Sequence, residues 1–249
     1  MAGHSKWKNI QHRKGAQDAK RGKLFTKLIR EITQATRLFG ADISANPRLR
    51  TAIDKALVAN MSKDTIENAI KRGSGANDGT QMEELTYEGY GLGGVAIYVE
   101  CMTDNRNRTV AEIRHAFTKC GGNLGTDGSV AYLFNQKGYF QFIEQINEDV
   151  LMEIALEAGA EDIIKKSDGS LELLTTPEQF TFVKNLLNEG KVIFQQAEVT
   201  FIPLNTITIN DKEMAEKLLK LIDMLEDLDD VQNVYSNADI PDSVITQLS

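Results

Sequence analysis

The sequence has 249 residues, is 41% hydrophobic and 26% charged, and carries a net charge of −8. These proportions are typical of an ordinary soluble globular protein, and the length allows one large domain or two to three small ones. No apolar run approaches the roughly 18 residues that a membrane helix needs, and no apolar stretch follows the basic N-terminus, which argues against a secretory signal. We therefore expect a cytoplasmic protein that does not bind membranes.

The charges are segregated along the chain. Residues 1–75 hold 16 Lys and Arg against 6 Asp and Glu, a net charge of +10, whereas residues 76–249 have a net charge of −18. A basic module is thus joined to an acidic body. Charge has to be counted for each module, and the basic one indicates an anionic partner.

Three amphipathic helices are predicted in the basic module. Apolar side chains recur there at helical spacing, and polar caps and glycines separate the stretches. Asn46 with Pro47 begins the second helix and Ser62 caps the third, because these residue types are favoured at helix starts. The stretches are residues 17–39, 47–60 and 63–73, and residues 1–16 are interpreted as a basic arm. We expect an N-terminal three-helix bundle.

Alternating strands and helices are predicted after a polar linker. Residues 138–195 show the order β-α-β-β-α-β of a ferredoxin-like plait, and the flanking segments 94–135 and 198–236 together give the same order. The expected fold class is multidomain α and α+β, in which the helical bundle is followed by two ferredoxin-like α+β domains, one inserted in the other. The expected domains are residues 1–75, residues 80–136 with 197–240, and the inserted residues 137–196. Individual elements include the linker 74–84, strands 94–103, 129–135, 138–143, 191–195 and 198–203, and a helix that begins at a Thr109–Glu112 capping box.

Residues 3–30 carry nine positive charges and a single negative one. Lys20, Lys23, Lys27 and Arg30 follow one another at steps of three and four, so they share one face of the predicted helix. A basic face with about 5–6 Å between neighbours can follow a phosphate backbone. A merely solvated face is the better reading of an isolated stripe, but a basic arm on an otherwise acidic chain favours nucleic acid. The predicted nucleic-acid-binding residues are Lys6, Trp7, Lys8, His12, Arg13, Lys14, Lys20, Arg21, Lys23, Lys27 and Arg30.

Trp7, the only tryptophan, lies between two lysines of the arm. An exposed indole in that setting would stack on an unpaired base. The alternative is an anchor that holds the arm against the helices, and the sequence favours neither. His4 and His12 lack metal-binding spacing, so hydrogen bonding near phosphates or a plain surface position is the better interpretation.

No catalytic, cofactor or metal site is predicted. The glycine-rich residues 87–94 precede a strand, whereas phosphate-binding loops follow one. Residues 103–109, TDNRNRT, offer a second anion contact at a helix start, although an ordinary capped turn is favoured. The acidic residues 223–230 lack the spacing of a calcium loop and are interpreted as a solvated helix end. The two cysteines form no CxxC pair and are interpreted as reduced, partly buried thiols.

Four long blocks carry a resemblance to a known family. They are GHSKWKNIQHRKGAQDAKRGKLFTKLIREI, NPRLRTAIDKALVANMSKDTIENAIKRGSG, YEGYGLGGVAIYVECMTDNRNRTVAEIRHAFTKCGGNLGTDGSVAYLF and LIDMLEDLDDVQNVYSNADI. Through them the sequence resembles the YebC/PmpR family, and it is also similar to the mitochondrial translational activator of cytochrome oxidase subunit one. Residues 137–200 match more loosely. The resemblance implies a helical bundle, two α+β domains and a cytoplasmic bacterial protein usually described as a probable DNA-binding transcriptional regulator, although other members look like ribosomal translation factors.

We therefore expect a non-enzymatic regulator of gene expression that needs no cofactor, metal or small-molecule substrate. Its predicted partner is DNA, with a ribosome-associated translation factor that binds structured RNA as the alternative. The third helix offers Lys63, Asn68, Lys71 and Arg72, a thin set for reading bases, which argues against DNA. The basic arm and helix with a single tryptophan suit irregular RNA. The usual description of the family favours DNA. An enzyme on a plait scaffold is the third alternative, because fold alone does not exclude one.

Overall fold

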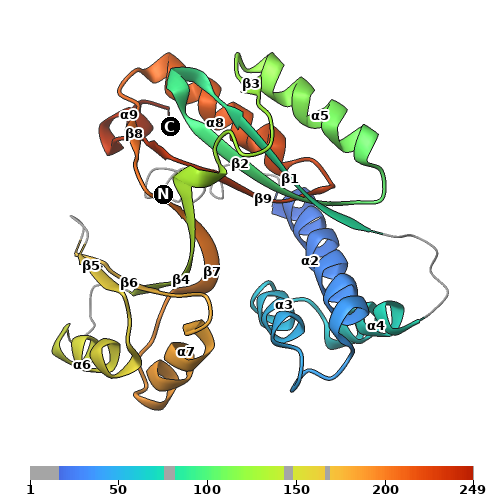
Figure 1. Cartoon of the computed structure of the whole chain (residues 1–249), viewed down its shortest axis with the longest axis vertical. Coiled ribbons are helices and arrows are strands. Elements are labelled where there is room, and N and C mark those ends of the chain that lie inside the picture. The colour runs from blue at the N-terminus through green and yellow to red at the C-terminus, as the bar shows by residue number, and fades with distance from the viewer. Residues whose placement is uncertain (1–16, 76–81, 143–147, 166–168, 249) are drawn as a thin grey trace. The chain divides into compact units, whose positions relative to one another are not determined.

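The structure is a computed structural model that describes residues 17–75, 82–142, 148–165 and 169–248. The chain forms two compact units, Met1–Ala131 with Thr206–Ser249, and Tyr132–Asn205. Helices and mainly antiparallel sheets make up both units (Figure 1), which confirms a mixed α and α+β architecture. The finer comparison with ferredoxin-like plaits and the division into three domains stay predictions. Within the described ranges, no helix is long and apolar enough to cross a membrane.

The first unit begins with three helices that pack around their own buried cluster. They are α2 (Gln17–Phe39), α3 (Pro47–Val58) and α4 (Lys63–Ser74). The predicted caps are present, since the side chain of Asn46 accepts a hydrogen bond from the Leu49 amide and Ser62 accepts one from Thr65. The buried cluster consists of Leu28, Ile32, Ala35, Leu49, Ala52, Ala56, Met61, Ile66 and Ala69.

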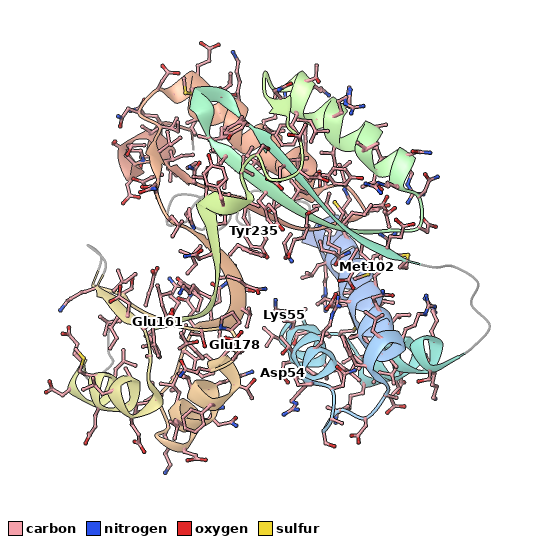
Figure 2. All side chains as sticks on the ribbon, in the orientation of Figure 1. Asp54, Lys55, Met102, Glu161, Glu178 and Tyr235 are labelled. Atoms are coloured by element: carbon pink, nitrogen blue, oxygen red, sulfur yellow. The ribbon has the colours of Figure 1, made fainter. Side chains whose placement is uncertain are left out.

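The rest of the first unit is an antiparallel sheet with the strand order β3-β1-β2-β9. Its strands are β1 (Glu83–Tyr90), β2 (Ala96–Thr103), β3 (Asn123–Leu124) and β9 (Val231–Ser236). Helices α5 (Arg106–Lys119) and α8 (Lys212–Glu226) pack on one face of this sheet (Figure 1). Figure 2 labels Met102 and Tyr235, which come from the neighbouring strands β2 and β9. A short parallel pair, β8 (Ile207–Thr208) with β10 (Ala238–Asp239), and helix α9 (Asp242–Leu248) complete the unit.

The sequence-based elements differ from this unit in two places. Strand β1 occupies the end of the predicted linker and the first half of the glycine-rich segment, because Gly89 pairs with Ile97 in a continuous register with β2. Helix α5 starts earlier than the Thr109–Glu112 capping box, since Asn105 is the cap and accepts from the Arg108 amide. In both cases a long-range or alternative local hydrogen bond outweighs the expected signal.

The second unit is a four-stranded antiparallel sheet with helices on one face. Its chain order is β4 (Phe134–Phe142), α6 (Glu148–Ala158), β5 (Asp162–Lys165), β6 (Leu171–Thr175), α7 (Phe180–Glu189) and β7 (Gln196–Pro203). The strand order is β5-β6-β4-β7. The predicted strands 129–135 and 138–143 are replaced by the single strand β4, which pairs with β7 from Phe134 to Gln141. Residues 191–195 form no strand, and Lys191 has a positive φ of 54° that ends α7.

Candidate nucleic-acid interface

The predicted binding residues divide into those that the structure describes and those that it does not. Helix α2 carries Arg21, Lys23, Lys27 and Arg30, whose side chains are described, and Lys20, of which only the helical backbone is described. The remaining predicted residues lie outside the described residues. They are Lys6, Trp7, Lys8, His12, Arg13 and Lys14.

Helix α2 places three basic residues on one face, as the spacing predicts. The ammonium group of Lys23 lies 3.0 Å from the main-chain oxygen of Asp227 and 3.1 Å from its carboxylate oxygen Oδ1. One turn later, Lys27 Nζ donates to the main-chain oxygen of Glu226 at 2.7 Å. The basic face is therefore in contact with the segment that follows α8.

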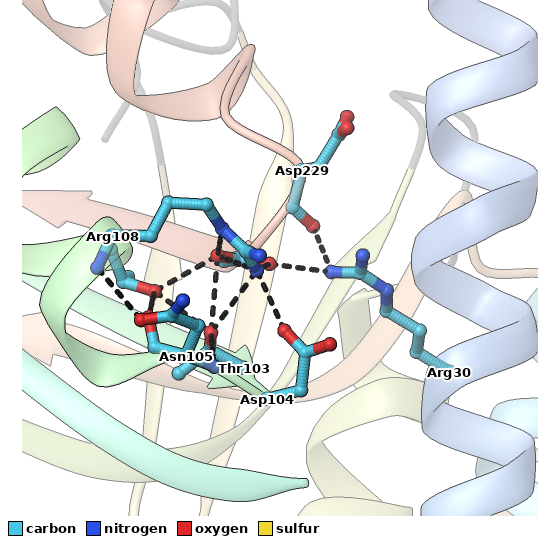
Figure 3. A network of polar contacts seen from close by, with 8 residues as sticks. Arg30, Thr103, Asp104, Asn105, Arg108 and Asp229 are labelled. Atoms are coloured by element: carbon cyan, nitrogen blue, oxygen red, sulfur yellow. Dashed lines mark hydrogen bonds and ion pairs between the residues drawn. The ribbon is translucent and has the colours of Figure 1, made fainter. Parts of the chain in front are cut away.

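Arg30 continues the same row. Its guanidinium donates to the main-chain oxygen of Asp229 at 2.6 Å and to Oδ1 of Asp230 at 3.1 Å (Figure 3). We call residues 226–230, which connect α8 to β9, the acidic turn, and we call Lys23, Lys27 and Arg30 the basic row. The structure brings the two together from positions about two hundred residues apart.

Arg21 takes no part in these contacts with the acidic turn. Its guanidinium carbon lies 5.3 Å from the centre of the Phe25 ring, one helical turn along α2, and the residue is exposed. A cation above an aromatic face is weakly attracted to it, but the guanidinium edge stays accessible. Arg21 is therefore oriented by its own helix and not by the acidic turn.

The acidic turn attracts cations for two physical reasons. The last carbonyl groups of an α-helix have no partner within the helix, and the helix dipole places partial negative charge there. Glu226 ends α8, and Asp227 is its C-cap. Four acidic side chains, at positions 226, 227, 229 and 230, add full charges to these carbonyl oxygens. The segment thus presents a short row of oxygens with anionic character.

Asp230 is the buried end of this row. Its carboxylate is 2% exposed and accepts hydrogen bonds from Thr103, from Thr109 and from the guanidinium of Arg108 (Figure 3). The Arg108 distances are 2.7 and 3.1 Å to Oδ2 and 2.9 Å to Oδ1. Burial raises the pKa of Asp230, but these donors lower it more, so the net pKa lies below the ordinary value.

This network accounts for residues 103–109, TDNRNRT, for which the sequence allowed either an anion contact or a capped turn. Arg108 is engaged by Asp230 and, at 2.8 Å, by Asp104, and Asn105 caps α5. The segment is therefore a capped turn whose arginine neutralises an internal carboxylate. Sequence reasoning missed Asp230, which it placed on a solvated helix end, because its partners lie more than a hundred residues away.

The glycine-rich segment 87–94 packs on neighbouring side chains. A Cβ atom added to Gly89 would lie 2.6 Å from the Phe117 ring, and one added to Gly91 would lie 2.8 Å from Leu218. At Gly93, which has a φ of +72°, the nearest atom would be the Met214 sulfur at 2.9 Å. Close packing against α5 and α8 thus accounts for these glycines without a bound phosphate.

The described residues bear on two kinds of chemistry, metal binding and reactive thiols. Among them, no group of three or more His, Cys, Asp or Glu side chains could hold a metal ion. Cys101 and Cys120 are buried and form no disulfide. Burial raises the pKa of the Cys101 thiol to about 12, so it is protonated at neutral pH and a poor nucleophile.

Helix α4 presents a second set of polar side chains. Lys63, Asn68, Lys71 and Arg72 are all exposed. Lys71 and Arg72 lie in the last helical turn. On α3, by contrast, Arg48 is paired with Glu31 at 2.7 Å and with Glu84 at 2.8 Å. Within the described residues, the exposed cations of α4 therefore form an alternative candidate surface for nucleic acid, apart from the basic row.

Comparisons with known proteins agree along the whole chain. The chain is 64% identical to a probable transcriptional regulatory protein of Methylococcus capsulatus and 62% identical to the transcriptional regulatory protein PmpR of Pseudomonas aeruginosa, each covering 100% of both chains. The crystal structure of a conserved hypothetical protein of Aquifex aeolicus has a TM-score of 0.80 and 51% identity, over 90% of this chain and 93% of that one. Residues 5–76 match the TACO1/YebC protein N-terminal domain, and residues 82–238 match the TACO1/YebC second and third domain. The chain therefore belongs to the TACO1/YebC family.

Proposed function

We propose that this protein is a non-enzymatic, cytoplasmic regulator of transcription that binds DNA through its basic N-terminal segment. The observation that carries the proposal is the basic row of α2, in which three cations on one helix face each meet an anionic or carbonyl oxygen within 3.1 Å. Side chains arranged in this way can contact successive phosphates of a nucleic-acid backbone. The names of the relatives supply the second support, since they describe transcriptional regulators.

A second candidate is a translation factor that binds structured RNA at the ribosome. The observation that favours it is the polar surface of α4, where Lys63, Asn68, Lys71 and Arg72 give few side chains for reading base edges in a major groove. RNA that is recognised by shape and backbone requires fewer such contacts. Crosslinking in cells, followed by sequencing of both DNA and RNA, separates the two candidates. Recovery of mainly ribosomal RNA would exclude promoter binding as the main activity.

The basic row is tested by a quadruple variant of the full chain, with Lys20, Lys23, Lys27 and Arg30 changed to Ala. If all four contact phosphates of duplex DNA, the slope of log K against log salt should flatten by up to roughly 3 to 4 units, since each neutralised phosphate contributes about −0.9. Affinity should fall by similar factors for every sequence tested, because phosphates carry no sequence information.

The matched control removes the exposed cations of α4 by changing Lys63, Lys71 and Arg72 to Ala. It should change the salt slope far less than the quadruple variant does. A reversed result, with the larger loss in the α4 variant, would place the interface on α4. Thermal unfolding of both variants checks that neither loss comes from a damaged fold.

A further inference from the structure

We propose that the acidic turn is an intramolecular competitor of nucleic acid, so that binding through the basic row requires α2 to leave the turn. This inference rests on the proposed function, because it concerns the same face of α2. The predicted partner of the free basic row is a polyanion. Its phosphates replace the oxygens of the acidic turn as hydrogen-bond acceptors.

The first step is that the turn occupies the atoms that phosphates would need. Lys23 Nζ, Lys27 Nζ and Arg30 Nη1 all donate to oxygens of residues 226–230 at 2.6 to 3.1 Å. An ammonium or guanidinium group donating to these oxygens cannot make its full set of contacts with a phosphate at the same time. The docked arrangement therefore competes with phosphate binding by the row.

The second step is that the docking is polar and that its outer end is accessible to water. The side chains of Lys23 and Asp227 are 41% and 60% exposed, whereas those of Arg30 and Asp230 are 25% and 2% exposed. In the described chain, the buried cluster of α2, α3 and α4 shares no residue with the buried cluster of the sheet, α5 and α8. Half-exposed ion pairs are weak and are screened by salt. Contacts of this kind can be exchanged for phosphate contacts without opening a hydrophobic core.

The third step is that the turn keeps its internal partners when α2 leaves. Asp230, the buried carboxylate, is still held by Arg108, Thr103 and Thr109 after Arg30 is removed. The turn is therefore preorganised, and undocking exposes mainly the three cations and the carbonyl oxygens that they contacted. Phosphates satisfy the cations and water satisfies the carbonyl groups.

The experiment compares two charge reversals in the full-length protein. Asp227→Lys places a positive charge beside Lys23 and weakens docking, and a lysine is well tolerated at the C-terminal end of a helix. Glu216→Lys makes the same change of net charge at an exposed site of α8. With fluorescein-labelled duplex DNA and single-stranded RNA as probes, Asp227→Lys should bind at least about threefold more tightly than Glu216→Lys. Equal affinities of the two variants for both probes would contradict the proposal that the acidic turn competes with nucleic acid.

A second measurement tests docking without nucleic acid, so that the two proposals can fail separately. In the wild-type protein, acetylation of Lys23 and Lys27 should be several times slower than that of Lys63 and Lys71, which are exposed on α4. Asp227→Lys and high salt should both accelerate the acetylation of Lys23 and Lys27. Equal acetylation rates for all four wild-type lysines would contradict competition by the acidic turn, whatever the affinities for the DNA and RNA probes. Slow labelling of Lys23 and Lys27, with no binding of either probe by any of the proteins, would overturn nucleic-acid binding and hence its competition with the turn.

Discussion

At the scale of single residues, Asp230 joins segments that are distant in the sequence. Its carboxylate accepts from Thr103 at the end of β2, from Thr109 and Arg108 on α5, and from Arg30 on α2. A carboxylate with 2% exposure would be costly to bury alone, and these donors provide the compensation. The residue therefore contributes to the stability of the first unit and also to the docking of α2.

Asp230→Asn should destabilise the protein by about 1 to 3 kcal/mol at neutral pH, because the uncharged amide group replaces one acceptor oxygen by a donor that faces the donors of Thr103, Thr109 and Arg108. Equilibrium urea unfolding measures the change. Asp229→Asn is the control, since that side chain is exposed and only its main-chain oxygen meets Arg30, so its effect should stay within about 0.5 kcal/mol. Equal effects of the two variants would show that the network contributes little.

The same carboxylate predicts a pH dependence. The net pKa of Asp230 is lowered in the folded protein, although burial acts in the opposite direction. A carboxyl of this kind stabilises the fold above its unfolded-state pKa, and the stabilisation is lost as pH falls through the folded-state pKa. The free energy of unfolding of the wild type should therefore fall more steeply than that of Asp230→Asn below about pH 4. Urea unfolding across a pH series compares the two, and parallel curves would contradict the prediction.

At the scale of elements, two helical glycines have opposite environments. A Cβ atom added to Gly22 in α2 would have no neighbour within 4 Å, whereas one added to Gly73 in α4 would lie 2.5 Å from the Thr33 main-chain oxygen and 2.7 Å from the Thr36 Cβ. Gly22→Ala should stabilise the protein by about 0.5 to 1 kcal/mol through helix propensity. Gly73→Ala should destabilise it by about 1 to 3 kcal/mol, because α2 and α4 would have to separate. Thermal and urea unfolding measure both, and the same sign for the two variants would contradict the close helix crossing.

Glu88 on strand β1 holds the loop of residues 128–131 through hydrogen bonds. Its buried carboxylate accepts from the amides of Gly128, Val130 and Ala131 at 2.6 to 2.8 Å. Burial raises the pKa of Glu88, but these three donors outweigh it and the net pKa is lowered. Glu88→Gln replaces one acceptor oxygen by a donor that faces backbone N–H groups, so these amides should exchange with solvent at least about tenfold faster, equivalent to 1.4 kcal/mol. Hydrogen exchange measures this, with the amides of β2 as internal control, and unchanged protection would show that the loop is held by other contacts.

Elements that depend on local signals were predictable from the sequence. Asn46 and Ser62 cap the helices that they were expected to cap, because a cap needs only a neighbouring amide. Strand β1 was missed, because its glycine and its polar residues resemble a loop until β2 supplies the hydrogen-bonded partner. The basic row was predicted as a face of α2, whereas its pairing with the acidic turn depends on contacts across about 200 residues that no local pattern contains.

At the scale of the whole molecule, the segregated charges meet within the first unit. The basic module and the acidic body have net charges of +10 and −18. The basic row contacts the acidic turn directly, and Arg48 of the basic module also pairs with Glu84 of the acidic body. Nucleic-acid binding by the row then has two ionic consequences, because phosphates release their condensed cations while the vacated turn attracts cations from solution.

This exchange predicts how salt acts on the full chain. Cation uptake by the vacated turn offsets part of the cation release from the nucleic acid, so the wild-type slope of log K against log salt should be shallower than the number of phosphate contacts implies. In Asp227→Lys the turn attracts fewer cations, and the slope should steepen by up to about one unit. In Glu216→Lys, which has the same net charge, the slope should change less, because Glu216 lies outside the acidic turn. Fluorescence anisotropy titrations with duplex DNA between about 50 and 200 mM salt measure the three slopes. Identical slopes for the two variants would mean that the acidic turn stays docked on α2 while DNA binds elsewhere on the basic module.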